Sequence, residues 1–296
     1  MKKQIENLKY TDIKNKLPLF QRQEGIAMLA VATTSILIGA GIVASRERRI
    51  YQNPFFVTLS KELEYAFIPW GDSLMTGKMG DRAVAGGWVL PLVEDINKKT
   101  SKKIAFYEPN KVLAISGQTS KELIEKLSQN HYLDTLDCPK IVCISIGGND
   151  LGNALLEIAS NNTTHLNLKI YSIMLDARKN FKKNFNNIIA IAHSFHNTQV
   201  LVLPIPDLTI TPYVNNIINL SYADKHLQNL VKQSLRASLF YFNRCIKRSC
   251  DEYKIPYIYM SKHTEELVCT EDGFHPNEKG LEMLALAARQ KFTFVK

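Results

Sequence analysis

The chain has 296 residues, 45% of them hydrophobic and 22% charged, a composition typical of a globular protein with a sizeable core. The formal net charge of +9 does not indicate a nucleic-acid-binding protein. Residues 1–49 hold nine Lys or Arg and four Asp or Glu, which leaves a charge of only +4 on the rest of the chain. No nucleic-acid recognition motif is visible, so no nucleic-acid partner is expected.

The first distinctive segment is GIAMLAVATTSILIGAGIVAS, residues 25–45, which carries no charged side chain. As a helix it would extend roughly 30 Å, enough to cross the hydrocarbon core of a bilayer. A buried core helix would show a polar face, and a cleavable signal peptide has a shorter apolar region after a short basic start. We therefore expect residues 25–45 to be a transmembrane anchor, preceded by an N-terminal tail over 1–24.

The basic residues around this segment bear on its orientation. Six Lys or Arg precede it, and four follow it up to Lys61. This balance favours a cytoplasmic N-terminus. The expected location is a single-pass membrane protein whose large C-terminal part faces the periplasm or the cell exterior.

Beyond the anchor, residues 46–64 are expected to form a polar connector that ends in a short helical patch, and residues 65–296 a single domain. Apolar runs predict strands over 64–70, 111–116, 140–146, 199–206 and 255–260. Apolar residues at spacings of three and four predict helices over 86–101, 120–129, 168–196, 226–253 and 277–292. Ser120 or Thr119 is the expected N-cap of the second helix.

Strands that alternate with long helices predict an α/β fold: three layers, α/β/α, around a mostly parallel five-stranded sheet. Ligands bind such sheets outside the carboxyl ends of the strands. The segment GDS follows the first predicted strand, SGQTS the second and GGND the third. These three loops are therefore expected at the same edge of the sheet.

A serine becomes a nucleophile at neutral pH only beside a base, which a third group usually orients. Ser73 lies in WGDSLMTG, and His275 lies in EDGFHPNEKG with Asp272 three residues before it. A carboxylate at that spacing, across a glycine-containing turn, can bind the imidazole and hold its tautomer. The six other histidines lack such a neighbourhood: His131, His165, His193, His196, His226 and His263.

Taken together, WGDSLMTG, SGQTS, IGGNDL and DGFHPNEKG resemble, in order and spacing, the SGNH (GDSL) hydrolase family over roughly residues 65–296. The resemblance implies a flavodoxin-like fold with Ser73 as nucleophile, His275 as general base and Asp272 as its carboxylate partner. It also implies an oxyanion hole made by the backbone N–H groups of Ser73 and Gly117 and the side-chain amide of Asn149. PIPDLTITP, residues 204–212, sits where the family has a strand and loop that edge the pocket.

The neighbouring acidic residues have structural interpretations. Asp72 is expected to hold the turn at the nucleophile, and Asp150 to cap a following helix. The absence of a GxSxG motif argues against an α/β-hydrolase elbow.

The expected function is a membrane-anchored serine esterase or lipase-like hydrolase that cleaves carboxylic esters or thioesters through an acyl-enzyme. No metal or organic cofactor is expected, and the expected partners are a small-molecule or lipid ester and the membrane. Two alternatives stay open: an O-deacetylase acting on cell-envelope carbohydrate, and a catalytically silent domain that binds a glycan or a protein.

Overall fold

The computed structural model describes residues 53–79, 82–129, 132–160, 166–258 and 272–296, which belong to one compact unit, Asn53–Lys296. The predicted tail over 1–24 and the predicted transmembrane segment over 25–45 lie outside the described residues. Across the described ranges, no helix combines the length and the apolar character that a membrane span requires.

A parallel sheet forms the centre of this unit, with strand order β5-β2-β7-β8. Its strands are β5 (Ala105–Tyr107), β2 (Tyr65–Gly71), β7 (Lys140–Ser145) and β8 (Thr198–Val202), and β6 (Leu113–Ala114) pairs with the end of β2. Every residue of β2 and β7 is buried, as expected of strands covered on both faces. The sheet therefore confirms the predicted mostly parallel α/β architecture.

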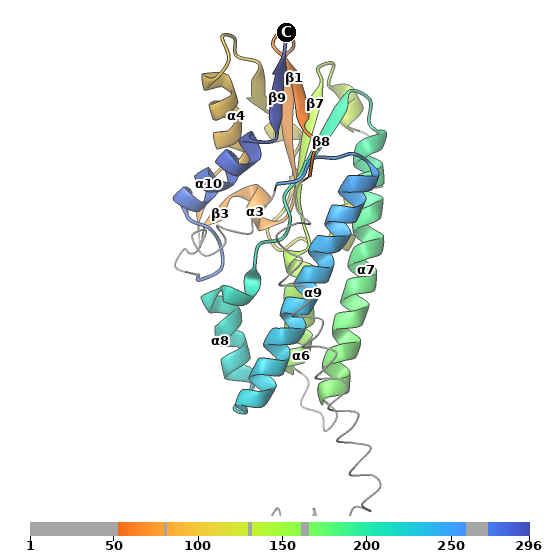
Figure 1. The fold of residues 1–296 in the computed structure, drawn as a ribbon, viewed down its shortest axis with the longest axis vertical. Helices are drawn as coiled ribbons and strands as arrows, with labels where there is room; N and C mark the ends of the chain where they lie inside the picture. Colours follow the sequence, from red (N-terminus) through yellow and green to blue (C-terminus); the bar gives the residue numbers. More distant parts are fainter. Residues whose placement is uncertain (1–52, 80–81, 130–131, 161–165, 259–271) are drawn as a thin grey trace, which may run out of the picture. The chain divides into compact units, whose positions relative to one another are not determined.

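The helices cover the sheet from both sides. Figure 1 shows α4 and α10 together on one side and α7 and α9 on the other. The bounds are α4 (Val89–Lys98), α5 (Ser120–Leu127), α6 (Gly148–Ser160), α7 (Leu166–Ser194), α8 (Pro212–Ser221), α9 (Lys225–Glu252) and α10 (Glu278–Arg289). The helix α8 and the first part of α9 extend beyond the sheet at the end where the short helix α3 (Ser73–Thr76) lies (Figure 1).

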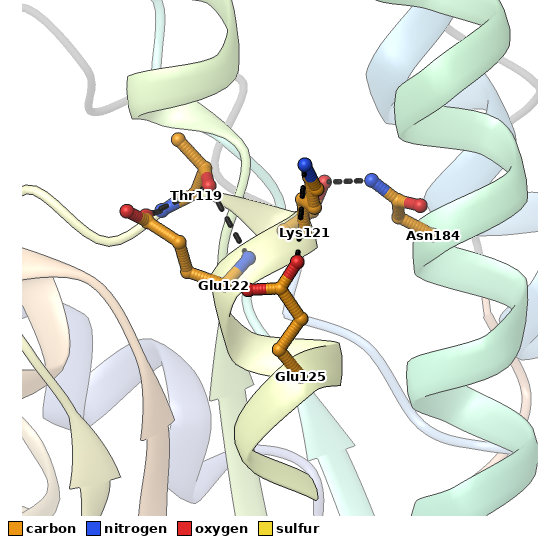
Figure 2. A network of polar contacts seen from close by, with 6 residues as sticks. Thr119, Lys121, Glu122, Glu125 and Asn184 are labelled. Atoms are coloured by element: carbon orange, nitrogen blue, oxygen red, sulfur yellow. Dashed lines mark hydrogen bonds and ion pairs between the residues drawn. The ribbon is translucent and has the colours of Figure 1, made fainter. Parts of the chain in front are cut away.

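The start of α5 shows how the sequence sets a helix boundary. Thr119 and Glu122 form a capping box, in which the backbone N–H of Thr119 donates to Glu122 Oε2 at 2.7 Å (Figure 2). Asn184 of α7 donates from Nδ2 to Ser120 Oγ at 3.0 Å, so the same turn is also joined to the neighbouring helix. Lys121 and Glu125 pair along the exposed side of α5 at 3.8 Å (Figure 2).

Two predictions are wrong near the ends of the described unit. The strand β1 (Val57–Ser60) occupies the part of the connector where a helical patch was expected. It pairs in parallel with β9 (Phe292–Val295), which follows α10 where the sequence predicts only a helix up to 292. Both strands have four residues, too few for a periodic pattern, and each depends on a partner at the other end of the domain for its hydrogen bonds.

The second and fifth predicted strands differ in extent from the structure. The second, predicted over 111–116, is shortened to β6, and β5 lies on the same side of β2 in a segment for which no strand was predicted. The fifth is reduced to one parallel bridge between Tyr257 and Val202, with residues 259–271 outside the described part. Beyond β8, the segment that was predicted to continue as a strand to 206 leaves the sheet and reaches the short 3-10 helix η3 (Leu208–Ile210) and then α8.

Candidate active site

Ser73 lies where β2 ends and the one-turn helix α3 begins. Asp72 caps this turn, because its Oδ1 accepts the backbone N–H of Leu74 at 3.2 Å, and Ser73 itself is buried. Gly71 has φ +140°, and a Cβ at this position would lie 1.8 Å from the carbonyl oxygen of Ser145 on β7. Only glycine therefore lets the chain leave the sheet here and place Ser73 at the strand ends.

His275 is held by Asp272 in the turn that precedes α10. Asp272 Oδ2 lies 2.6 Å from His275 Nδ1, and Asp272 Oδ1 accepts the backbone N–H groups of Phe274 at 2.9 Å and His275 at 3.0 Å. The Asp272 carboxylate thus fixes both the backbone of this turn and the orientation of the His275 ring. The ring of Phe274 packs edge-on against the imidazole, with 5.0 Å between the ring centroids.

The structure brings Ser73, His275 and Asn149 to one pocket at the carboxyl ends of the strands. Leu74, Ile205, Leu208, Phe274 and Leu284 supply apolar side chains to the same pocket. Ile205 and Leu208 belong to the 204–212 segment, which edges the pocket as the resemblance implies. A hydroxyl, an imidazole and a carboxamide therefore meet beside a surface that suits a hydrocarbon group.

Asn149 and Gly117, the two oxyanion-hole candidates other than Ser73, belong to neighbouring segments. Asn149 Nδ2 donates to the backbone carbonyl of Gln118 at 3.0 Å, which brings α6 to the loop that follows β6. Gly117 is on the exposed side of this loop, with φ +84° and no atom within 4 Å of where a Cβ would be. Gly117 is not among the residues that line the pocket, so its place in the oxyanion hole remains a prediction, as do the roles of Ser73 and Asn149.

Two carboxyl groups have raised pKa values: Asp72, which is buried next to the nucleophile, and Asp150, which is partly buried. Burial raises the pKa of Asp72 to about 7, the negative charge of Asp150 adds to the rise, and the backbone N–H groups of Leu74 and Gly148 oppose it. Burial also raises the pKa of Asp150, against hydrogen bonds from Ser120. The carboxyl group of Asp72, which lines the pocket, therefore changes its charge near neutral pH.

Asp150 differs from its expected role as a helix cap. It lies in the first turn of α6, and its carboxylate accepts the backbone N–H of Ser120 at 2.9 Å and the Ser120 hydroxyl at 2.5 Å. Asp150 therefore joins the start of α5 to the start of α6. Ser120 also accepts from Asn184, so three helices meet at this serine.

Sequence reasoning missed two residues that hold the walls of the site. Gln118 is buried and bonds to the end of β2, and Asn243 of α9 bonds to both backbone groups of Ile205. Gln118 lies inside the SGQTS motif, but the sequence does not show that its amide is buried, because its partner Gly71 is 47 residues away. Asn243 has no signal in the sequence, because its partner is 38 residues away.

These features define an α/β protein in which a serine, a carboxylate-bound histidine and an asparagine line one pocket at the carboxyl ends of parallel strands. The chain belongs to the family of GDSL-like lipases and acylhydrolases, whose model matches residues 69–288. No protein among the curated ones matches the chain.

Several solved structures share the fold. A lipase from a goat rumen metagenome is 19% identical with a TM-score of 0.54, and the match covers 77% of this chain and 97% of that one. Phospholipase A1 from Streptomyces albidoflavus is 12% identical with a TM-score of 0.51, covering 76% and 98%. An extracellular lipase from Streptomyces rimosus is 13% identical with a TM-score of 0.51, covering 77% and 99%.

Proposed function

We propose that this protein is a serine acyl hydrolase that cleaves carboxylic esters or thioesters at Ser73. One observation carries the proposal: Ser73 and His275 line the same pocket, and Asp272 Oδ2 lies 2.6 Å from His275 Nδ1. Because Nδ1 binds the carboxylate, Nε2 is the imidazole atom that we expect to accept the proton of the serine hydroxyl. This is the order of contacts that a nucleophile, a base and an orienting carboxylate require.

In this mechanism, Ser73 Oγ attacks the carbonyl carbon of the ester while His275 accepts the hydroxyl proton. Asp272 stabilises the imidazolium that forms. The backbone N–H groups of Ser73 and Gly117 and the amide of Asn149 donate to the developing oxyanion. His275 then returns the proton to the leaving alcohol, and water, activated by the same histidine, releases the acid from Ser73. Apart from the ester and one water molecule, each step uses side chains and backbone groups of this chain.

The substrate that we propose is an ester with an apolar acyl group. The apolar side chains of the pocket support this, because an acyl chain can pack against them, whereas they offer a sugar few hydrogen-bond partners. The family and the lipase and phospholipase names of its structural neighbours support a lipid ester in the same way.

We further propose that residues 25–45 anchor the protein in a membrane, with the catalytic unit on the periplasmic or extracellular side. The support is the run of uncharged residues in the sequence and the excess of basic residues before it. Such an anchor would keep the site close to lipid esters.

The test is a Ser73→Ala variant assayed with p-nitrophenyl esters of increasing acyl length, and with acetylated xylan as a carbohydrate arm. Removing the nucleophile is expected to lower kcat by at least about 10⁴-fold. The control is Ser128→Ala, which removes an exposed hydroxyl at the end of α5 and should leave activity unchanged. Both variants should melt at the wild-type temperature.

Labelling with a fluorophosphonate separates an enzyme from a silent binding domain, because the reagent reacts with an activated serine. The wild-type protein and Ser128→Ala should be labelled, and Ser73→Ala should not. Full turnover by Ser73→Ala would reject the mechanism, and a folded wild-type protein without turnover or labelling would favour the silent domain.

A further inference from the structure

The side chain of Gln118 uses all of its hydrogen-bonding groups inside the protein. It is 3% exposed, and its Nε2 donates to the carbonyl oxygens of Gly71 at 2.8 Å and Leu113 at 3.0 Å. Its Oε1 accepts from Lys126 Nζ at 2.5 Å. One amide thus joins the ends of β2 and β6 to α5.

The residue before it has no comparable support. Ser116 and Gly117 are exposed, and no atom lies near the position of a Cβ on Gly117. The turn itself contains one backbone hydrogen bond, from Gln118 N–H to the Ile115 carbonyl at 3.0 Å. The direction of the Gly117 N–H therefore depends on the buried anchor that follows it in the chain.

Gln118 is also connected to the other two donors of the proposed oxyanion hole. Its backbone carbonyl accepts the Asn149 amide at 3.0 Å, and its side chain binds Gly71, which stands two residues before Ser73. The three donors come from the start of α3, the loop after β6 and the first turn of α6, which are far apart in the sequence. Gln118 follows Gly117 in its loop, binds Asn149 of α6 and binds Gly71 in the strand that leads to Ser73.

We propose that Gln118 is a positioning residue that sets the geometry of the oxyanion hole, an inference that rests on the proposed function. It touches no substrate in this scheme. It aligns the N–H of Gly117 with the amide of Asn149 and the N–H of Ser73. Because an oxyanion forms only in the transition state, misalignment lowers kcat and leaves KM almost unchanged.

The test uses Gln118→Met, which keeps the length of the side chain and removes its hydrogen bonds. The value of kcat for p-nitrophenyl acetate is expected to fall about 10–100-fold, a smaller loss than complete removal of a hole donor can give. The inhibition constant of an alkylboronic acid, which forms a tetrahedral adduct with the serine, should rise by the same factor. The matched control is Gln129→Met, the same change at an exposed glutamine just beyond α5.

A second variant covers the case in which Gln118→Met does not fold. Gln118→Glu keeps the size of the side chain and its contact with Lys126, but removes both donors to Gly71 and Leu113. It should show the same loss in kcat. In a double-mutant cycle, Gln118→Met and Asn149→Ala should together cost less than the product of their separate effects, since both act on one hole.

The outcomes separate this inference from the proposed function. If the wild-type protein turns over esters and a folded Gln118 variant keeps the wild-type kcat and boronate affinity, the positioning role is wrong and the hydrolase remains. A loss confined to thermal stability, with kcat unchanged, overturns it in the same way. If the wild-type protein shows neither turnover nor fluorophosphonate labelling, the proposed function and the positioning role both fall.

Discussion

At the scale of single residues, the site contains two carboxyl groups in different environments. Asp272 is partly exposed and binds His275, so its charge faces an imidazole. Asp72 is fully enclosed and faces backbone N–H groups and another carboxyl group. The two acids therefore differ in environment, although each stands within three residues of a proposed catalytic side chain.

The raised pKa of Asp72 predicts how stability depends on pH. Its pKa is about 7 in the folded protein against 3.8 when exposed, so the folded state keeps a proton that the unfolded state releases between these values. The free energy of unfolding should fall as pH rises from about 4 to 7, by at most about 1.4 kcal/mol per pH unit from this group. Replacement by Asn in Asp72→Asn should remove that contribution.

The measurement is urea unfolding of the wild type and Asp72→Asn at pH 5 and pH 7.5. The variant should gain stability relative to the wild type at the higher pH. Glu125→Gln, an exposed acid on α5, serves as the control, and its difference from the wild type should not change in this way. If the free energies of unfolding of the wild type and Asp72→Asn differ by the same amount at both pH values, the raised pKa of Asp72 is contradicted.

At the scale of elements, one wall of the pocket is an irregular segment held by a helix. Beyond β8 the chain leaves the sheet, and none of the strands in the described part of the chain pairs with Ile205. Asn243 of α9 replaces the strand: its Oδ1 accepts the Ile205 N–H at 2.9 Å, and its Nδ2 donates to the Ile205 carbonyl at 2.8 Å. The same side chain therefore fixes a pocket residue and packs α9 against the sheet edge.

Asn243→Leu should consequently weaken both the fold and the site. Leaving the two backbone groups of Ile205 without partners is expected to lower the free energy of unfolding by about 1–3 kcal/mol. The apolar wall should loosen too, which raises KM for long acyl chains more than for acetate. Denaturant unfolding and the dependence of KM on chain length measure these effects. Asn229→Leu, at an exposed position of α9, is the control, and equal stability of the two variants would disprove the role of Asn243.

At the scale of the whole molecule, the catalytic unit closes on itself. The pairing of β1 with β9 brings the two ends of Asn53–Lys296 together, and all residues proposed for catalysis lie inside this unit. Its core includes Val57 and Phe292 from those terminal strands. A domain cut at residue 65 would lose β1 and expose part of this core.

The proposed roles, hydrolysis by residues 53–296 and membrane binding through residues 1–52, can be tested separately. The fragment 53–296 should hydrolyse soluble p-nitrophenyl butyrate at the rate of the full chain, because the site is complete within it. The full chain should float with anionic phospholipid vesicles and resist extraction by carbonate, and the fragment should remain in solution. A full chain that stays in solution would contradict the proposed anchor without affecting the hydrolase, and an inactive but folded fragment would contradict the self-contained site.

Features that depend on local pattern could be predicted from the amino-acid sequence. The alternation of apolar runs and helical spacings predicted the parallel sheet and its main helices, because burial on both faces leaves a continuous apolar strand. The spacing of Asp272 and His275 within one turn predicted their contact, because three residues are enough to fix that geometry. The order of the strand-end loops predicted that Ser73 and Asn149 lie at one edge of the sheet, and the family resemblance added His275; the three residues line one pocket.

Contacts between distant segments could not be predicted in this way, because they depend on how the whole chain folds. The pairing of β1 with β9, the reduction of the fifth strand to one bridge, the bond from Asp150 to Ser120 and the amide contacts of Gln118 and Asn243 each join residues that are far apart in the chain. A polar side chain looks the same in the sequence whether its partner is water or a buried carbonyl. Its role appears only when folding removes the water and leaves one partner within reach.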